Sequence, residues 1–210
     1  MLMNQMETAL INSPPRRWLQ RWYEVPWLRR LGGTLPADAR VLEIGCGPGY
    51  GTRLILDQFG AAHVDALDLD PAMTARARRR LTKYGDRVRL HTGDAADLYT
   101  SIGATDAAYN AVFDFAIVHH IPAWRDAVAE IARVLRPGGK FYFDEVTARA
   151  LARPTYRLMF DHPTDDRFTA DQFRTELERH GLYVGDRWRA PIGGDYLIGV
   201  ATRREVTRQP

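Results

Sequence analysis

Short apolar runs alternate with amphipathic stretches along this chain of 210 residues. The apolar runs predict buried strands at 41–44, 64–68, 87–91, 111–118 and 140–145. Apolar positions at helical spacing predict helices at 52–59, 71–84, 124–135 and 169–180. Two further runs, 182–189 and 196–202, flank Gly193-Gly194 and predict a terminal hairpin. This order of elements predicts an α/β fold, in which helices cover both faces of a mostly parallel sheet.

The carboxyl ends of parallel strands share one edge of a sheet, and ligands of such folds bind beyond that edge. The predicted strands bring five groups of polar or glycine residues to it. These groups are Gly45–Gly49, Asp68, Asp94, His119-His120 and Asp144-Glu145. We therefore expect the functional site at this edge.

The most informative stretch is residues 41–51, VLEIGCGPGYG, a strand that ends in a glycine-rich turn before the helix predicted at 52–59. Glycine permits positive φ and lets a ligand approach the main chain closely. The free N–H groups at the start of the helix favour an anionic group. A dinucleotide-binding turn requires glycine at position 50, where this chain has Tyr50, so the pattern does not fit that ligand.

Two carboxylates narrow the choice of ligand further. Glu43 precedes the turn, where it would repel a pyrophosphate but attract a cationic amine. Asp68 ends the second strand, where a carboxylate can accept both hydroxyl groups of a ribose. A ligand with a carboxylate, an ammonium group and an unphosphorylated ribose fits these groups. S-adenosylmethionine (SAM) has all three.

Four motifs of this chain, in order, resemble those of the class I SAM-dependent methyltransferases. They are Glu43-x-Gly45-x-Gly47-x-Gly49, Asp68, Gly93-Asp94-Ala95 and Leu135-Arg136-Pro137-Gly138-Gly139. The resemblance covers roughly residues 38–203 and is strongest to the small-molecule branch that includes the ubiquinone and menaquinone C-methylases. It implies a Rossmann-like sheet of seven strands, one of them antiparallel and part of the C-terminal hairpin.

The resemblance also implies a cofactor and the residues that bind it. The methyl donor would be SAM and the product S-adenosyl-L-homocysteine. The implied cofactor-binding residues are Glu43, Gly45, Cys46, Gly47, Gly49, Asp68, Leu69, Asp94, Ala95 and Val118. Within the family, the residue that matches Asp94 reaches the adenine amine, although Asp97 lies close enough in this sequence to take that place.

His119 and His120 follow the fourth predicted strand and are the candidates for a general base. Because successive strand residues face opposite ways, we expect only one of them to point at the substrate. Packing or cofactor contact is the competing interpretation of this pair. His119, His120, His162 and Asp144 match no metal-binding spacing, so no metal is predicted.

The acceptor is expected to be a small molecule, with O, N or C as its nucleophile. Similar enzymes that methylate adenine or glutamine amides use an Asn/Asp-Pro-Pro-aromatic element at the end of the fourth strand. This chain has His119-His120-Ile121-Pro122 there. A lipid or a secondary metabolite would suit the branch. An RNA or protein methyltransferase, and a non-methylating SAM-binding protein such as a cyclase or a partner subunit, remain alternatives.

Charge and cysteine content limit the partners and the compartment. The net charge of +3 lies within residues 1–33, where five arginines face two glutamates, and the remainder is neutral. This distribution does not favour nucleic acid as a partner. Arg76, Arg78, Arg79 and Arg80 are interpreted as a solvated helix face. Cys46 is the only cysteine, and no stretch has the length of a membrane span or a signal peptide, so a cytoplasmic protein is expected.

The chain is predicted to form one structural domain with two specialised segments. Residues 1–35 would form an N-terminal helical cap on the SAM-binding domain at 36–210, and residues 146–168 a lid insertion. Trp18, Trp22 and the arginines of 14–31 allow three interpretations: a helix packed on the core, a cap over the active site, or a membrane-surface helix. Pro26 is expected to break or kink this helix. The oligomeric state is expected to be monomer or homodimer.

Overall fold

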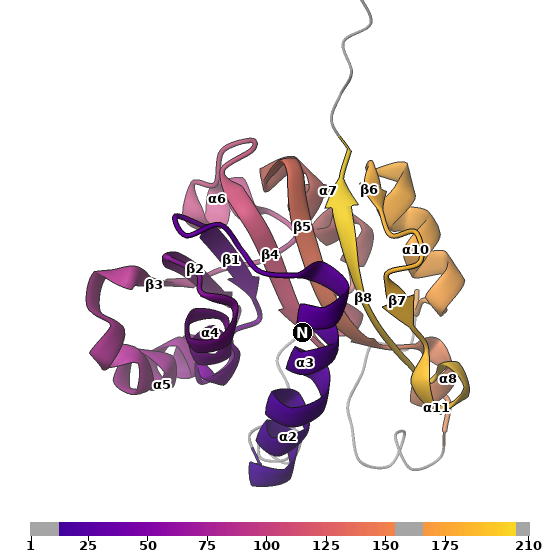
Figure 1. Ribbon diagram of the computed structural model, residues 1–210, viewed down its shortest axis with the longest axis horizontal. Coiled ribbons are helices and arrows are strands. Elements are labelled where there is room, and N and C mark those ends of the chain that lie inside the picture. The colour runs from indigo at the N-terminus through magenta and orange to yellow at the C-terminus, as the bar shows by residue number, and fades with distance from the viewer. Residues whose placement is uncertain (1–12, 154–165, 205–210) are drawn as a thin grey trace, which may run out of the picture.

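The computed structural model describes residues 13–153 and 166–204 of the chain. Its strands form one eight-stranded sheet in the order β3-β2-β1-β4-β5-β8-β6, and β7 also pairs with β8 (Figure 1). The strands are β1 Arg40–Ile44, β2 His63–Asp68, β3 Val88–Thr92, β4 Tyr109–Phe115, β5 Leu135–Val146, β6 Leu182–Tyr183, β7 Trp188–Arg189 and β8 Tyr196–Arg203. From β1 the chain builds the sheet first toward β2 and β3, and then on the other side of β1 with β4 and β5. Ligands of such sheets bind where the strand order reverses in this way, here between β1 and β4.

The strands β1 to β5 run parallel, and β8 runs antiparallel to β5. Because β6 and β7 are in turn antiparallel to β8, β8 is the one reversed strand of the sheet. The predicted fold class is therefore confirmed. The strand predicted at 182–189 is divided into β6 and β7, because the chain turns between them at Gly185, whose φ is 56°.

Helices cover both faces of this sheet. They are α2 Pro14–Leu19, η1 Gln20–Glu24, α3 Val25–Gly32, α4 Tyr50–Leu54, η2 Ile55–Phe59, α5 Pro71–Leu81, η3 Thr82–Arg87, α6 Leu98–Ile102, η4 Val118–His120, α7 Trp124–Val134, α8 Ala148–Leu151, α10 Ala170–Arg179 and α11 Pro191–Gly194. Within the described residues, no helix is long and apolar enough to cross a membrane.

The core consists of two main apolar clusters, one on each face of the sheet. One cluster joins the sheet to α3, α4, η2 and α5, and the other joins it to α6, α7 and α10. Successive residues of β4 show the division, because Ala111 and Phe113 belong to the first cluster and Val112 to the second. The site edge is therefore supported from both faces.

The N-terminal helical segment is continuous from α2 through η1 to α3. Pro26 does not break it, because Pro26 lies in the first turn of α3, directly after the π-helical turn η1. Val25 and Leu28 are fully buried against the sheet. In contrast, Trp18 is 64% exposed and Trp22 60% exposed. The α3 part of this segment is therefore core packing.

Candidate active site

The glycine turn connects β1 to α4 at the carboxyl edge of the sheet. Gly45, Gly47 and Gly49 have φ values of 65°, 51° and 82°, in the left-handed region that favours glycine. A Cβ atom on Gly45 would lie 2.2 Å from Cγ1 of Ile117, a residue that follows the end of β4. Gly45 therefore turns the chain and also leaves space for Ile117 beside the turn.

Glu43 lies directly beneath the glycine turn and is 1% exposed. One of its carboxylate oxygens accepts a hydrogen bond from the Thr52 hydroxyl, and a Cβ atom on Gly51 would lie 2.1 Å from the other. Burial raises the pKa of Glu43 to about 8, against the effect of the Thr52 hydrogen bond. Glu43 therefore fixes the turn to the start of α4. Its attraction to a cationic amine stays a prediction.

Asp68 connects the end of β2 to the same turn. Its two carboxylate oxygens accept hydrogen bonds from the backbone N–H groups of Gly47, at 2.7 Å, and Asp70, at 2.8 Å. Burial raises the pKa of Asp68, while both of these bonds lower it. Because each carboxylate oxygen can accept more than one hydrogen bond, Asp68 keeps acceptor capacity for a ligand hydroxyl.

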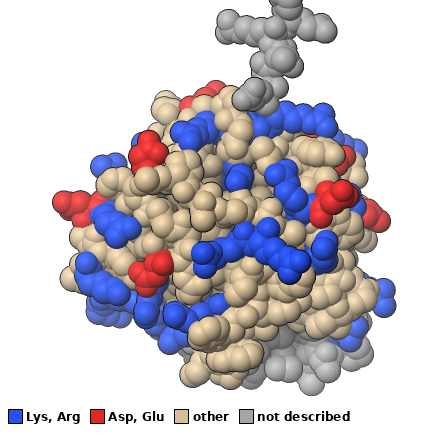
Figure 2. Space-filling model, viewed as in Figure 1, with Lys and Arg blue, Asp and Glu red and all other residues tan. Residues whose placement is uncertain are grey.

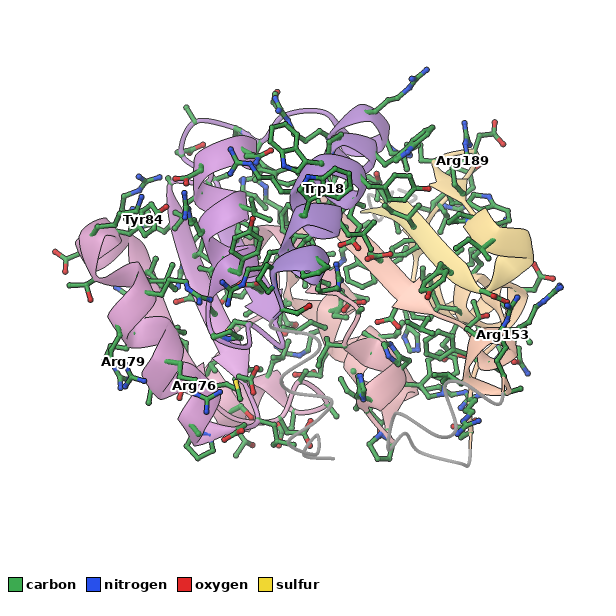
Figure 3. All side chains as sticks on the ribbon, turned by 90° about the horizontal axis from the view of Figure 1, so that it is seen from below. Trp18, Arg76, Arg79, Tyr84, Arg153 and Arg189 are labelled. Carbon is green, nitrogen blue, oxygen red and sulfur yellow. The ribbon has the colours of Figure 1, made fainter. Side chains whose placement is uncertain are left out.

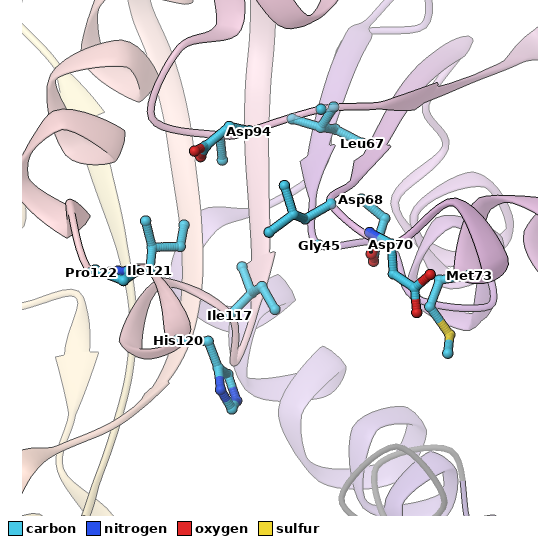
Figure 4. Close-up of a pocket in the computed structure, with 13 residues that line it drawn as sticks. Gly45, Leu67, Asp68, Asp70, Met73, Asp94, Ile117, His120, Ile121 and Pro122 are labelled. Carbon is cyan, nitrogen blue, oxygen red and sulfur yellow. Dashed lines mark hydrogen bonds between the residues drawn. The ribbon is translucent and has the colours of Figure 1, made fainter. Parts of the chain in front are cut away.

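A pocket opens between the ends of β1, β2 and β3 and the turn η4 (Figure 4). We call it the Asp68 pocket. It is lined by Gly45, Leu67, Asp68, Leu69, Asp70, Met73, Gly93, Asp94, Ala95, Ile117, His120, Ile121 and Pro122. Aliphatic side chains and carboxylates thus share one cavity. This combination fits an adenosine group, because the base can pack on apolar side chains while carboxylates accept hydrogen bonds from the ribose and the amine.

Half of the predicted cofactor-binding residues line this pocket. They are Gly45, Asp68, Leu69, Asp94 and Ala95. Asp97 does not line it, because its carboxylate caps α6 through the Thr100 N–H at 3.0 Å. The other predicted residues, Glu43, Cys46, Gly47, Gly49 and Val118, lie outside its lining. Contact of all ten with the cofactor stays a prediction.

Cys46 and Val118 have structural partners near the pocket. The Cys46 N–H donates to the Leu67 carbonyl at 2.8 Å, and burial raises the pKa of its thiol, so Cys46 packs as a small uncharged side chain. Val118 is fully buried, and its N–H donates to Glu145 at 2.6 Å.

The fourth strand ends earlier than its apolar pattern predicts. β4 ends at Phe115, Ala116 takes a positive φ of 64°, and Val118–His120 form the 3₁₀ turn η4. The Ile117 N–H donates to the Asp114 carboxylate at 2.9 Å, which stabilises this bend. The early bend is the reason that Ile117, Ile121 and Pro122 line the pocket without having been predicted.

The same bend corrects the expected alternation of the two histidines. Their rings are not on opposite faces of a strand, because both lie on η4 with centroids 4.2 Å apart. His120 lines the Asp68 pocket, and His119 lines a second cavity. The pair therefore stands between two cavities.

His119 is held by Glu145, a residue of β5. The distance from His119 Nδ1 to Glu145 Oε2 is 2.6 Å, and both side chains are at least nine-tenths buried. Burial, with the nearby Arg16 charge, lowers the pKa of His119 to about 3. The ring is therefore neutral, and when Glu145 is ionised this contact places the ring proton on Nδ1.

Glu145 also belongs to a buried pair of carboxyl groups. Asp114 lies beside it and is fully buried, and burial together with the Glu145 charge raises the pKa of Asp114 well above its usual range. Burial raises the pKa of Glu145 to about 7. Two adjacent buried carboxyl groups disfavour double ionisation, so at neutral pH the pair holds a proton.

The second cavity lies between η4, α7, α8 and the segment 166–168. We call it the Trp124 cavity. It is lined by His119, Ile121, Trp124, Val146, Leu151, Asp166, Arg167 and Phe168. The Trp124 indole donates to the Asp166 carbonyl at 2.9 Å and fixes this segment over α7. Ile121 lines both cavities, which therefore adjoin.

The segments predicted as cap and lid reach this edge to different extents. Residues at both described ends of 146–168 line the Trp124 cavity, whereas Tyr156, Met159 and Phe160 lie outside the described residues. Phe168 is 2% exposed and packs on Trp124 with ring centroids 4.9 Å apart.

The predicted cap reaches the same edge through Arg16 of α2. Arg16 contacts Glu24 at 2.5 Å and Asp144, near the end of β5, at 3.6 Å. The lid and cap functions stay predictions.

No group of three or more His, Cys, Asp or Glu side chains is placed to hold a metal ion in the described part of the chain. His162, one of the four residues considered from the sequence, lies outside that part.

Comparison with known proteins finds a family and several relatives that match part of this chain. The methyltransferase-domain family matches residues 41–139, from β1 into β5. A Mycolicibacterium smegmatis protein described as a probable S-adenosylmethionine-dependent methyltransferase is 41% identical over 59% of this chain and 43% of its own length. A trans-aconitate 2-methyltransferase of Variovorax paradoxus is 32% identical over 82% of this chain and 61% of its own length. The chain thus spans about half the length of these curated relatives.

Solved structures share the fold. A chain from the complex between the Haloferax volcanii Trm112 methyltransferase activator and its methyltransferase has a TM-score of 0.73 at 18% identity, over 98% of this chain and 100% of that one. The strand order defines a Rossmann-like α/β fold. The match over residues 41–139 and these relatives agree with the class I SAM-dependent methyltransferase motifs found in the sequence. The closer likeness to quinone C-methylases stays a prediction.

Proposed function

We propose that this chain transfers a methyl group from SAM to a small-molecule acceptor through an O, N or C nucleophile. The observation that carries this proposal is the meeting of two cavities at Ile121 and the histidine pair, on one edge of the sheet. The Asp68 pocket would hold the adenosine part of the cofactor. The acceptor would enter at the Trp124 cavity, whose volume of about 10 Å³ would have to widen to admit it.

Orientation is the main contribution that such a site makes to methyl transfer. When bound, SAM supplies an electrophilic methyl group on a sulfonium sulfur. Asp68 and Asp94 would fix the adenosine part, and aliphatic residues such as Ile117 would exclude water beside it. Holding two reactants in line lowers the barrier by on the order of 7–11 kcal/mol relative to a bimolecular reaction.

His119 is the residue best placed to remove a proton from an acceptor. Its ring lines the Trp124 cavity, and Glu145 holds Nδ1, so Nε2 is the basic nitrogen. A proton taken up at Nε2 would create an imidazolium, which the Glu145 carboxylate stabilises. His120, which lines the Asp68 pocket, is assigned to cofactor contact.

The cavity chemistry favours a small, mostly apolar acceptor. Trp124, Val146 and Leu151 supply apolar surface, and Asp166 and Arg167 stand at the same cavity. The trans-aconitate relative is named for a small acid, which supports an acceptor of this size.

Mass spectrometry of a metabolite extract incubated with SAM tests this proposal. We expect a small molecule to gain the mass of one methyl group in place of hydrogen, and His119→Ala to reduce its rate of formation while leaving S-adenosyl-L-homocysteine binding intact. Methylation confined to RNA or protein fractions would contradict the small-molecule proposal. Cofactor binding with no methylated product from any fraction would instead indicate the non-methylating alternative.

A further inference from the structure

Four arginines surround a hollow beside the glycine turn, away from both cavities. Arg17 of α2 and Arg76, Arg79 and Arg80 of α5 line it together with Pro48 of the turn. We call it the arginine pocket. Figure 3 labels Arg76 and Arg79 along α5, and Figure 2 shows Lys and Arg side chains gathered over this lower left part of the molecule. The interpretation of these arginines as a solvated helix face holds for Arg76, Arg78 and Arg79, which are exposed, whereas Arg80 is half-buried. Arg78 is the one of the four that does not line the hollow.

The charges of this pocket have no acidic partners among the described residues. Other arginines of the chain have them, since Arg53 pairs with Asp57 and Arg133 with Glu130. None of the four arginines of the pocket forms such an ion pair in the described part of the chain. Several cations in one concave surface repel one another, so the pocket as it stands is electrostatically unfavourable.

Arg17 and Arg80 are also partly shielded from water. The Nε atom of Arg17 is buried and has no hydrogen-bond partner, an arrangement that costs free energy unless a ligand completes it. Arg80 donates from Nη1 to the Pro48 carbonyl at 2.9 Å, and burial with the Arg17 and Arg53 charges lowers its pKa. An anion in the pocket would relieve both the repulsion and the unpaired donor.

We propose that the arginine pocket is a binding site for a phosphate group. Guanidinium donors in a planar fork match the oxygens of phosphate and bind them in pairs. Several arginines converging from two helices suit a dianion better than a single carboxylate, because each can neutralise part of the charge.

This site is distinct from the proposed cofactor and acceptor cavities. No residue lines both the arginine pocket and either of them. The two ligand sites are nevertheless neighbours, since Met73 of α5 lines the Asp68 pocket one turn before Arg76. The proposal does not depend on methyl transfer, and it is tested without turnover.

The phosphate could be carried by a soluble molecule or by a phospholipid headgroup. Trp18 and Trp22 follow Arg17 on the N-terminal helical segment, and both indoles are more than half exposed. Exposed tryptophans beside arginines are typical of segments that lie at a membrane surface. The chemistry at the arginine pocket is the same for both sources, and the experiment distinguishes them.

The test is a titration of the full chain with inorganic phosphate and pyrophosphate, followed by the NMR signal of the Arg17 Nε–H group. We expect saturable binding that shifts this signal. Arg79→Gln should weaken binding about tenfold, the effect of losing one charge-assisted hydrogen bond that is partly exposed. Arg78→Gln removes the same charge from the same helix outside the pocket and should leave the affinity unchanged.

A titration without saturation at millimolar concentrations would overturn the proposal, and so would equal weakening by Arg79→Gln and Arg78→Gln. Vesicles then identify the source. Binding to phosphatidylglycerol vesicles but not phosphatidylcholine vesicles, lost in both Arg79→Gln and Trp18→Ala, would assign a lipid headgroup. Phosphate binding without vesicle binding would assign a soluble phosphorylated ligand.

Discussion

Glu145 determines the tautomer of His119, on which the proposed role of this ring as a base depends. A buried histidine without a partner at Nδ1 could take either tautomer, whereas the 2.6 Å contact with Glu145 selects the one whose Nε2 accepts a proton. The low pKa of His119, about 3, makes its ring a weak base unless a negative charge supports the imidazolium. That charge depends on the protonation of the carboxyl pair formed by Glu145 and Asp114.

The rate of an acceptor that loses a proton should therefore depend on pH. Because burial raises the pKa of Glu145 to about 7, kcat/KM should rise with pH as this carboxyl loses its proton, and level off above that value. Glu145→Gln should lower the rate and remove the rise near neutral pH. A pH–rate profile of the wild type and this variant measures both effects. An unchanged profile in Glu145→Gln would show that Glu145 only packs against η4.

The residues of the site were predictable from sequence to different degrees. Asp68 and Asp94 follow short, clear strands, and their motif spacing places them at the edge of one pocket. The sequence also brought Glu145 to this edge, but its contact with His119 depends on how β4 bends beyond Phe115. A run of apolar residues carries no signal for such a bend, since the decisive positive φ falls on Ala116, a residue with no turn preference of its own.

At the scale of elements, the N-terminal helical segment divides into a buried part and an exposed part. Val25 and Leu28 of α3 are fully buried in the cluster that also holds Tyr142, and the Gly32 carbonyl accepts a hydrogen bond from the Tyr142 hydroxyl at 3.2 Å. The sequence showed aromatic and aliphatic residues throughout 14–31 without showing which of them face the sheet. Pro26 was misleading, because the π-helical turn before it lets the helix continue.

This division predicts different costs for two truncations. Leu28→Ala should lower the free energy of unfolding by about 2–5 kcal/mol, because it leaves a cavity in the core. Trp22→Ala removes a larger side chain that is 60% exposed, and its effect should stay within about 0.5 kcal/mol. Denaturant unfolding of both variants measures these values. A larger loss in Trp22→Ala than in Leu28→Ala would contradict the assignment of α3 as the anchored part.

At the scale of the whole molecule, the alternation of strands and helices predicted the mostly parallel α/β sheet, because it follows from local patterns and from right-handed crossovers. The single reversed strand was implied by the family resemblance together with the terminal hairpin. Sites shared between distant segments were less accessible. The arginine pocket needs α2 and α5 beside one turn, and the Trp124 cavity needs η4 beside the segment 166–168. No local periodicity indicates such neighbours, since they result from packing over the edge of the sheet.

The account rests on the Asp68 pocket as the cofactor site, and calorimetry with S-adenosyl-L-homocysteine tests this most directly. We expect binding in the low micromolar range, about −8 kcal/mol, and much weaker binding of NAD. Asp68→Asn, which keeps one acceptor oxygen for the turn, should weaken binding about 10- to 100-fold through loss of a charge-assisted hydrogen bond. Folded protein that binds neither SAM nor its product, or an Asp68→Asn variant with unchanged affinity, would contradict this account.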